Sequence, residues 1–186
     1  MKLCTVLLCA AGGAILATSC SPLPRASAPL PPMQSGGSIW QGEGMSGPPS
    51  VRISLSHQRA YLYKGEQLAG MSPISSGREG LDTVTGSFHI LQKDREHRSS
   101  LFGHYLDESG TVLRKDVDTS KDPMPPGAHF EGADMPCWMR ITGGTGMHAG
   151  YLPGYPDSHG CIRMPAVMAE AFFNSVSVGT PVRIDP

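Results

Sequence analysis

The sequence is poor in charged residues, in aromatic side chains and in long apolar runs. Asp, Glu, Lys and Arg make up 17% of the 186 residues, aromatic residues make up 6%, and the formal net charge is −1. Without an excess of positive charge there is no broad basic surface to attract nucleic acid. Glycine (23) and proline (17) are abundant, which favours many turns and a strand-rich fold. The length suits one domain with a sizeable core.

The only long apolar run lies at the N-terminus and resembles a bacterial lipoprotein signal. Lys2 precedes an apolar stretch from Leu3 to Ala17, which is short for a membrane span. The stretch ends in small residues and Cys20. We therefore expect residues 1–20 to be a signal peptide, with Cys20 as the lipidation site and the protein anchored in the periplasm or cell envelope. The alternative is ordinary secretory cleavage near Ser19.

The rest of the chain divides into a tether and one domain. Residues 21–49 are rich in Pro, Ser and Gly and hold few large apolar residues, so we expect a tether without a core. Residues 50–186 form the expected domain, with a polar and irregular insertion at about 94–136. Apolar periodicity predicts a helix over 165–179 and strands over 51–55, 60–63, 67–75, 137–141 and 181–184. Residues 83–93 are expected to form a turn and then a further strand.

Cysteine is scarce in the expected domain, which holds only Cys137 and Cys161. Cys161 follows His159 by two residues and His148 by thirteen. An imidazole that takes the thiol proton would make Cys161 a nucleophile. The residues alone leave two alternatives open. One is a zinc site built from the two histidines, Cys161 and Cys137, although no CxxC is present. The other is an inert thiol or a Cys137–Cys161 disulfide.

The segment MHAGYLPGYPDSHGCIRM, residues 147–164, resembles the signature of the L,D-transpeptidase family, the YkuD-type catalytic domain. That signature is a histidine, a glycine-rich spacer, then Ser/Thr-His-Gly-Cys, an apolar residue and Arg or Asn. Three other stretches resemble the opening hairpin, the TPTG region and the closing strand of the family: VRISLSHQRAYLYKGEQL, SSGREGLDTVTGSFHI and GTPVRI. The resemblance covers roughly residues 50–186. It implies a mainly β fold of sandwich-like mixed sheets, with one main helix after the cysteine.

The resemblance also implies a reaction on peptidoglycan stem peptides. The cysteine attacks the carbonyl of the third stem residue, usually a diamino acid, and expels the terminal D-alanine. The resulting thioester passes its acyl group to an amine of a second stem or of a lipoprotein lysine, with no metal or cofactor. Water as the acceptor would make the protein an L,D-carboxypeptidase. An endopeptidase and a non-catalytic peptidoglycan-binding module of the same fold are further alternatives.

Carried over to this sequence, the resemblance implies roles for the residues of the motif. Cys161 is the nucleophile, and His148 is the base that receives its proton and later the acid that protonates the leaving amine. The backbone carbonyl of Ala149 orients His148. The N–H groups of Gly160 and Cys161 stabilise the oxyanion, at about 3 kcal/mol for such a donor. Residues expected to shape the pocket, hold the loop or face a substrate carboxylate are Ser158, His159 and Arg163.

Overall fold

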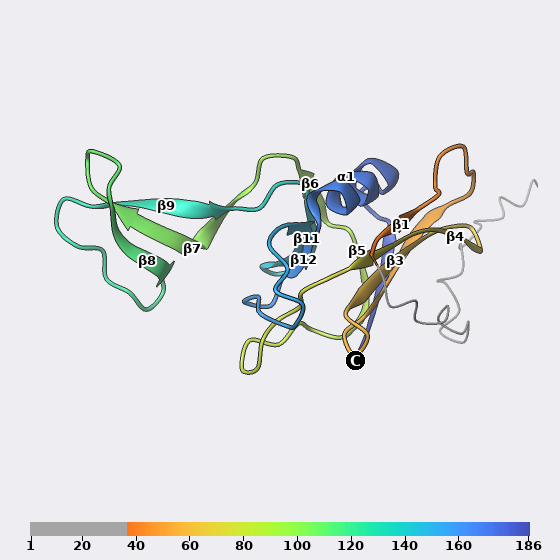
Figure 1. The fold of residues 1–186 in the computed structure, drawn as a ribbon, viewed down its shortest axis with the longest axis horizontal. Helices are drawn as coiled ribbons and strands as arrows, with labels where there is room; N and C mark the ends of the chain where they lie inside the picture. Colours follow the sequence, from red (N-terminus) through yellow and green to blue (C-terminus); the bar gives the residue numbers. More distant parts are fainter. Residues whose placement is uncertain (1–36) are drawn as a thin grey trace, which may run out of the picture.

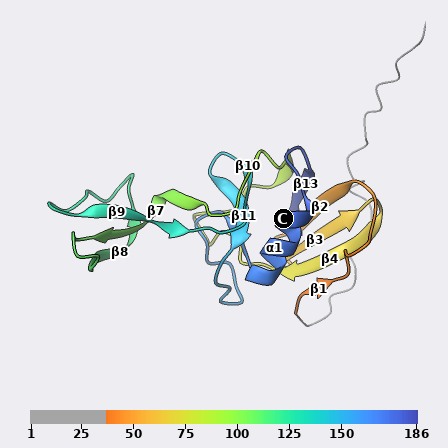
Figure 2. The same ribbon diagram turned by 90° about the horizontal axis from the view of Figure 1, so that it is seen from above.

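The computed structural model describes residues 37–186, which form three β-sheets and one α-helix (Figure 1). The expected signal peptide, the lipidation site Cys20 and residues 21–36 of the expected tether lie outside the described residues. Two sheets and the helix form the body of the domain, and the third sheet projects from the body as an arm (Figures 1 and 2). Within residues 37–186, no helix has the length and apolar character that crossing a membrane requires.

The larger sheet of the body has six strands in the order β1-β4-β3-β2-β13-β5. Their bounds are β1 Ile39–Trp40, β2 Pro49–Ser54, β3 Arg59–Lys64, β4 Gln67–Pro73, β5 Gly86–His89 and β13 Pro181–Asp185. Val51 and Ile53 of β2 are fully buried, as their alternation with polar residues predicts. The C-terminal strand β13 runs parallel to β2 and antiparallel to β5. It therefore ties the two ends of the domain together inside one sheet.

The second sheet of the body has four strands in the order β12-β11-β10-β6, and the helix α1 contacts β11. The bounds are β6 Gln92–Asp94, β10 Trp138–Thr142, β11 Thr145–Ala149, β12 Ile162–Met164 and α1 Ala166–Ser175. One apolar core joins both sheets to the helix. Its fully buried members include Leu62, Ile90, Met147, Ile162 and Phe172. The prediction of a mainly β protein with one main helix after Cys161 is confirmed for the described residues.

Two predicted elements of the body differ in detail from the structure. The single strand expected after a turn within 83–93 is two strands, β5 and β6, which belong to different sheets. The helix ends at Ser175 rather than near Gly179, and the next residue, Val176, is extended. The Nζ of Lys93 donates to the carbonyl oxygens of Phe173 (2.6 Å) and Val176 (2.7 Å). This cation satisfies carbonyls at the end of the helix, where the macrodipole favours positive charge.

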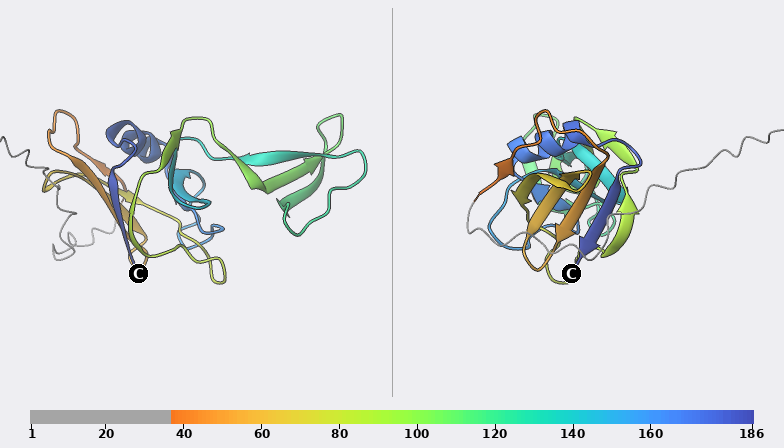
Figure 3. Two further views of the ribbon diagram at one scale, coloured as in Figure 1. Left: turned by 180° about the vertical axis from the view of Figure 1, so that it is seen from behind. Right: turned by 90° about the vertical axis from the view of Figure 1, so that its right-hand side faces the viewer.

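The stretch 94–136 is an ordered arm and not an irregular insertion. It contains a three-stranded antiparallel sheet in the order β8-β7-β9, formed by β7 Arg98–Leu106, β8 Val112–Asp118 and β9 His129–Asp134. The sheet stands apart from the body when it is seen from behind as well (Figure 3). Both faces of most of its length are exposed, so its strands lack the alternation of apolar and polar residues that marks a half-buried strand. Its few buried side chains are Tyr105, Leu106 and Val117.

The domain also begins earlier than Ser50. The short strand β1 pairs with β4, and Trp40 packs against the core. The indole ring lies so close over Gly70 that an added Cβ would come within 2.7 Å of it. Residues 39 and 40 therefore belong to the sheet, although the Pro, Ser and Gly around them predicted a tether.

Candidate active site

Cys161 and His148 lie at one face of the four-stranded sheet. β11 and β12 are parallel neighbours, in a register that sets His148 beside Arg163. Cys161 comes two residues before Arg163, immediately before β12 begins. Side chains two residues apart on an extended chain point the same way. The pairing therefore brings all three side chains to one face, and all three line the same cleft.

The ring of His148 is buried and held in one orientation by the backbone. Its Nδ1 lies 2.8 Å from the carbonyl oxygen of Ala149, the contact that the resemblance implies. A carbonyl only accepts, so Nδ1 carries the proton and Nε2 is free to accept one. Burial, opposed by the Ala149 carbonyl and assisted by the charges of Arg163 and His97, lowers the pKa of His148 to about 4. At neutral pH the imidazole is uncharged, as a general base must be.

The thiol of Cys161 is protonated in the resting site. Burial raises its pKa, while the backbone N–H of Gly146 and the charge of Arg163 act in the opposite direction. Its Sγ donates to the carbonyl oxygen of Gly144 at 3.4 Å. Both glycines belong to the β10–β11 hairpin, which therefore holds the thiol from one side. Since thiol and imidazole are both neutral, the proton must move during the reaction and not before it.

A tight turn over residues 158–161 carries the thiol to the start of β12. Gly160 has φ +105°, a conformation that residues with a side chain rarely adopt. Ser158 Oγ donates to the carbonyl oxygen of Cys161 and accepts the N–H of Gly160 at 3.1 Å. Thr83 Oγ1 donates to the carbonyl oxygen of Gly160 at 2.9 Å and accepts the N–H of Gly77 at 2.8 Å. Two hydroxyl groups therefore fix the turn.

The bonding of this turn corrects one prediction about the oxyanion. The N–H of Gly160 donates to Ser158 Oγ, so it is used inside the turn and does not face a substrate. An oxyanion donor must point at the place where the negative charge develops. Of the two N–H groups in the prediction, that of Cys161 remains the candidate.

His159 is held by partners outside the Cys161–His148 pair. Its ring stacks on Phe102 of the arm, with 4.2 Å between centroids and 21° between planes. A guanidinium nitrogen of Arg78 lies 3.0 Å from His159 Nε2, and because arginine only donates, Nε2 accepts. Burial, with Arg78 next in effect, lowers the pKa of His159. Its Nε2 is thus occupied, and His159 lines the cleft.

Arg163 holds the loop before the nucleophile. One of its guanidinium nitrogens lies 3.0 Å from the carboxylate of Asp157. Its backbone exchanges two hydrogen bonds with Ser75, both of 3.0 Å. Its aliphatic stem lies over Gly150, where an added Cβ would come within 3.2 Å of it. Of the two roles expected for Arg163, this geometry supports the first, because its guanidinium is already paired.

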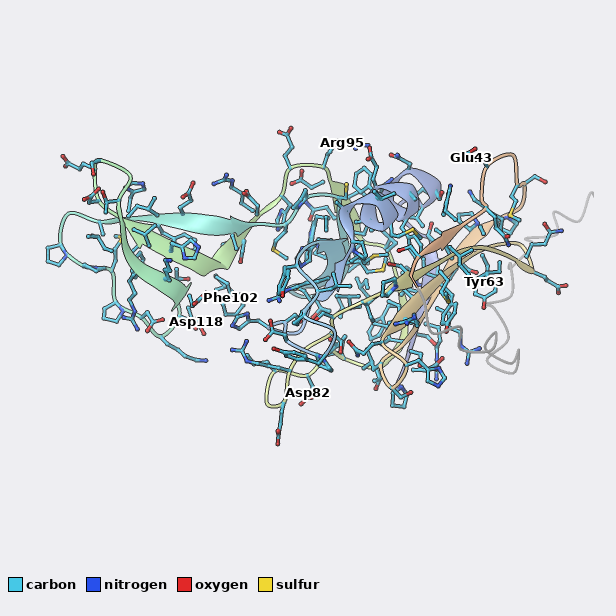
Figure 4. The ribbon with its side chains drawn as sticks, viewed as in Figure 1. Glu43, Tyr63, Asp82, Arg95, Phe102 and Asp118 are labelled. Carbon is cyan, nitrogen blue, oxygen red and sulfur yellow. The ribbon has the colours of Figure 1, made fainter. Side chains whose placement is uncertain are left out.

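The cleft around Cys161 has a volume of about 380 Å³. Its floor is the four-stranded sheet, and one wall is the base of the arm, from Ser99 to Phe102 on β7 and at Ala133 and Asp134 on β9. Between two paired positions at this base, β7 has more residues than β9, which makes a bulge. Figure 4 labels Phe102 on the arm near its junction with the body. The arm is thus part of the site.

A family model matches most of the chain. The model of the L,D-transpeptidase catalytic domain, YkuD, matches residues 48–184. The chain belongs to the L,D-transpeptidase catalytic domain family. The family is one of acyltransferases that act on peptidoglycan stem peptides. A search among curated proteins finds no match.

Solved structures of L,D-transpeptidases share the fold. One from Mycobacterium smegmatis is 19% identical, with TM-score 0.56, over 74% of this chain and 58% of that protein. L,D-transpeptidase 1 of Mycobacterium tuberculosis is 21% identical, with TM-score 0.53, over 75% and 62%. One from Enterococcus faecium is 24% identical, with TM-score 0.53, over 75% and 50%. The chain thus spans only half to about three-fifths of these relatives, and the likeness shows the fold alone.

The described residues bear on the disulfide and the zinc alternatives for Cys161. Cys137 and Cys161 are both free thiols, so the disulfide alternative is wrong. Cys137 is buried beside β10, and burial raises its pKa. For the zinc alternative, no three His, Cys, Asp or Glu side chains within residues 37–186 are grouped as a metal site would need.

The sequence-based prediction missed three residues that contact the turn over residues 158–161, either at Gly160 or at His159. Thr83 lies in the TVTG stretch that carried part of the resemblance, so a signal for it was present. Arg78 and Phe102 reach His159 from a loop and from the arm. Arg78 lies in the same quoted stretch as Thr83, but no local pattern points to Phe102, and both contacts depend on how distant segments meet.

Proposed function

We propose that the protein is a peptidoglycan L,D-transpeptidase in which Cys161 is the nucleophile and His148 is the general base. The carrying observation is that Cys161, immediately before β12, and His148, on the adjacent parallel strand β11, line one cleft. Nδ1 of His148 is bound to the Ala149 carbonyl, and Nε2 is left to accept a proton. Family membership supports the reaction class.

In the first half-reaction, Cys161 Sγ attacks the carbonyl carbon of the third stem residue while His148 Nε2 takes the thiol proton. The N–H of Cys161 stabilises the tetrahedral oxyanion. The carbon–nitrogen bond to D-alanine then breaks, and His148 gives its proton to the leaving amine. The products are free D-alanine and a thioester on Cys161.

In the second half-reaction, an amine from another stem or from a lipoprotein lysine attacks the thioester carbonyl. His148 removes a proton from the amine and returns it to the sulfur as the carbon–sulfur bond breaks. The residues that line the cleft carry out the proton transfers and supply the oxyanion donor, and the amine is the acceptor of the acyl group. If water replaces the amine as acceptor, the product is a shortened stem.

We also propose that the protein acts in the periplasm from a lipid anchor on Cys20. The support is the pattern of residues 1–20, with Lys2 before a short apolar run that ends on the cysteine. A triacylated cysteine gives lasting attachment, since stable anchoring takes more than one acyl chain. Labelling cells with a palmitate analogue tests this, because Cys20→Ser should abolish labelling and release the protein from the membrane fraction.

Product analysis by mass tests the proposed function. Purified protein is incubated with a defined stem tetrapeptide and the products are separated. A cross-linked dimer with one released D-alanine per link is expected, together with a transient acyl adduct on the Cys161 peptide. A shortened monomer alone would make the protein a carboxypeptidase. If no product or adduct forms, the proposal fails and the binding-module alternative takes its place.

A further inference from the structure

Arg140 is the cleft-lining arginine without an ion pair. It lies on β10 and lines the cleft, and none of the ion pairs found within residues 37–186 includes it. Its Nε is buried and makes no hydrogen bond there. By contrast, Arg163 is paired with Asp157 in the same cleft. A cleft-lining guanidinium without a counter-ion among the described residues is a candidate binding group for an anion that enters the cleft.

The neighbouring strands offer Arg140 no carboxylate. Its cross-strand partners are Gln92 on β6 and Gly146 on β11, both uncharged. Asp94 of β6 is engaged by His97, with 3.3 Å between the carboxylate and Nδ1. Arg140 lacks a carboxylate partner because no acidic residue occupies a position directly opposite it on either neighbouring strand.

Charge in the cleft is one-sided. Its only acidic lining residue among the described ones is Asp134, whose carboxylate lies 2.9 Å from Nε of Arg98. Arg163 on the floor is paired with Asp157, which leaves the charge of Arg140 unpaired, and His148 is neutral at pH 7. A low-dielectric cleft with unbalanced positive charge concentrates anions.

The register places Arg140 in line with the nucleophile. Arg140 on β10 pairs with Gly146 on β11. Met147, the residue after Gly146, pairs with Ile162, the residue after Cys161, so the same register sets Gly146 beside Cys161. The three residues therefore form one row across the sheet, with Arg140 two strands from Cys161, or about 10 Å between backbones. No side chain from Gly146 intervenes.

The indole of Trp138 covers the glycine in this row. An added Cβ on Gly146 would come within 2.6 Å of the Trp138 ring. Trp138 lines the cleft, is only 2% exposed, and its Nε1 is a second buried donor without a partner in the described chain. The floor between Arg140 and the thiol is therefore aromatic.

We propose that Arg140 binds a carboxylate of the acyl-donor peptide. This inference rests on the proposed function and adds a substrate-binding residue to it. A donor stem carries a terminal carboxylate one residue beyond the scissile carbonyl, about 3.5 Å along the chain. It carries a second carboxylate where the third residue is a diamino diacid. An arginine fork matches either group and reaches it across the Trp138 ring.

The first experiment tests the anion site without a peptide substrate. Cys161 of the full chain is alkylated with anionic iodoacetate or neutral iodoacetamide, and the modified Cys161 peptide is quantified by mass. Arg140→Gln should lower the iodoacetate-to-iodoacetamide rate ratio about three- to tenfold, since a nearby positive charge attracts only the anion. Arg183→Gln removes an arginine from β13, outside the cleft, and should leave the ratio unchanged. An unchanged ratio in Arg140→Gln overturns the proposal, while the iodoacetamide rate shows whether the site is folded.

The second experiment identifies the carboxylate. Three tetrapeptide donors are compared: one with both carboxylates, one with an amidated C-terminus and one with lysine as the third residue. Arg140→Gln should lower kcat/KM about 10- to 100-fold for donors that keep the bound carboxylate, as expected for a lost charge-assisted bond. It should have little effect on the donor that lacks it. An equal loss with all three donors overturns the assignment, and if the unaltered protein turns over none of them, the proposed function fails while the alkylation result still decides the site.

Discussion

Lowering the pH should destabilise the folded protein through His148. The imidazole is buried and neutral in the folded state, with its pKa lowered to about 4 mainly by burial. In the unfolded chain the same group titrates near 6.5. A group with a depressed folded-state pKa binds more protons when unfolded, so its contribution is present above pH 6.5 and is lost as the pH falls toward 4.

The size of this effect follows from the two pKa values. Each pKa unit is worth about 1.4 kcal/mol, so the difference between 6.5 and about 4 gives about 3 kcal/mol in full. Between pH 7 and pH 4.5, where most of the change occurs, His148 should contribute roughly 2 kcal/mol of the lost free energy of unfolding. This is a large part of the stability of an ordinary domain.

Urea unfolding at pH 7 and pH 4.5 measures the loss, and His148→Asn supplies the matched control. The amide of Asn keeps an N–H for the Ala149 carbonyl but does not titrate. Carboxylates and other histidines contribute equally to both proteins, so the difference between their pH dependences isolates His148. The wild-type protein should lose roughly 2 kcal/mol more than the variant. If both lose the same free energy, the imidazole is not buried and neutral as the structure has it.

Three further predictions concern the residues around the pair. His148→Ala should lower the rate of D-alanine release 100-fold or more, and His159→Ala should lower it less; the reverse order would show that the base is assigned to the wrong histidine. Thr83→Val should cost about 1–2 kcal/mol of unfolding free energy and lower kcat, with Thr83→Ser restoring both, because only the hydroxyl bonds Gly160; equal behaviour of the two variants would contradict this. The iodoacetamide rate at Cys161 should still rise above pH 9, since burial raises the thiol pKa; a plateau by pH 7 would instead mean a preformed thiolate.

The parts of the fold that were predictable from the sequence are those with a buried face. Val51 and Ile53 alternate with polar residues, and their strand is where the pattern places it. The strands of the arm were missed because both of their faces meet solvent over most of their length. The place of Trp40 in the sheet was missed because β1 has only two residues and is surrounded by Pro, Ser and Gly.

The site was predictable only where a local motif carries it. Cys161 and His148 stand in a recognisable pattern, and the parallel pairing of β11 and β12 brings them to one face. Phe102 and Arg140 lie outside that pattern. Their place in the cleft depends on the bulge at the base of the arm and on the register of β10, neither of which the sequence alone specifies.

Release of D-alanine from a defined stem tetrapeptide tests the central claim most directly. Wild-type protein and Cys161→Ala are compared at equal concentration, with thermal unfolding of both as the check on folding. The proposed mechanism predicts release by the wild type and none above background by the variant, because the thiol forms the bond that expels the amine. Release by a folded Cys161→Ala at a rate near that of the wild type would contradict it.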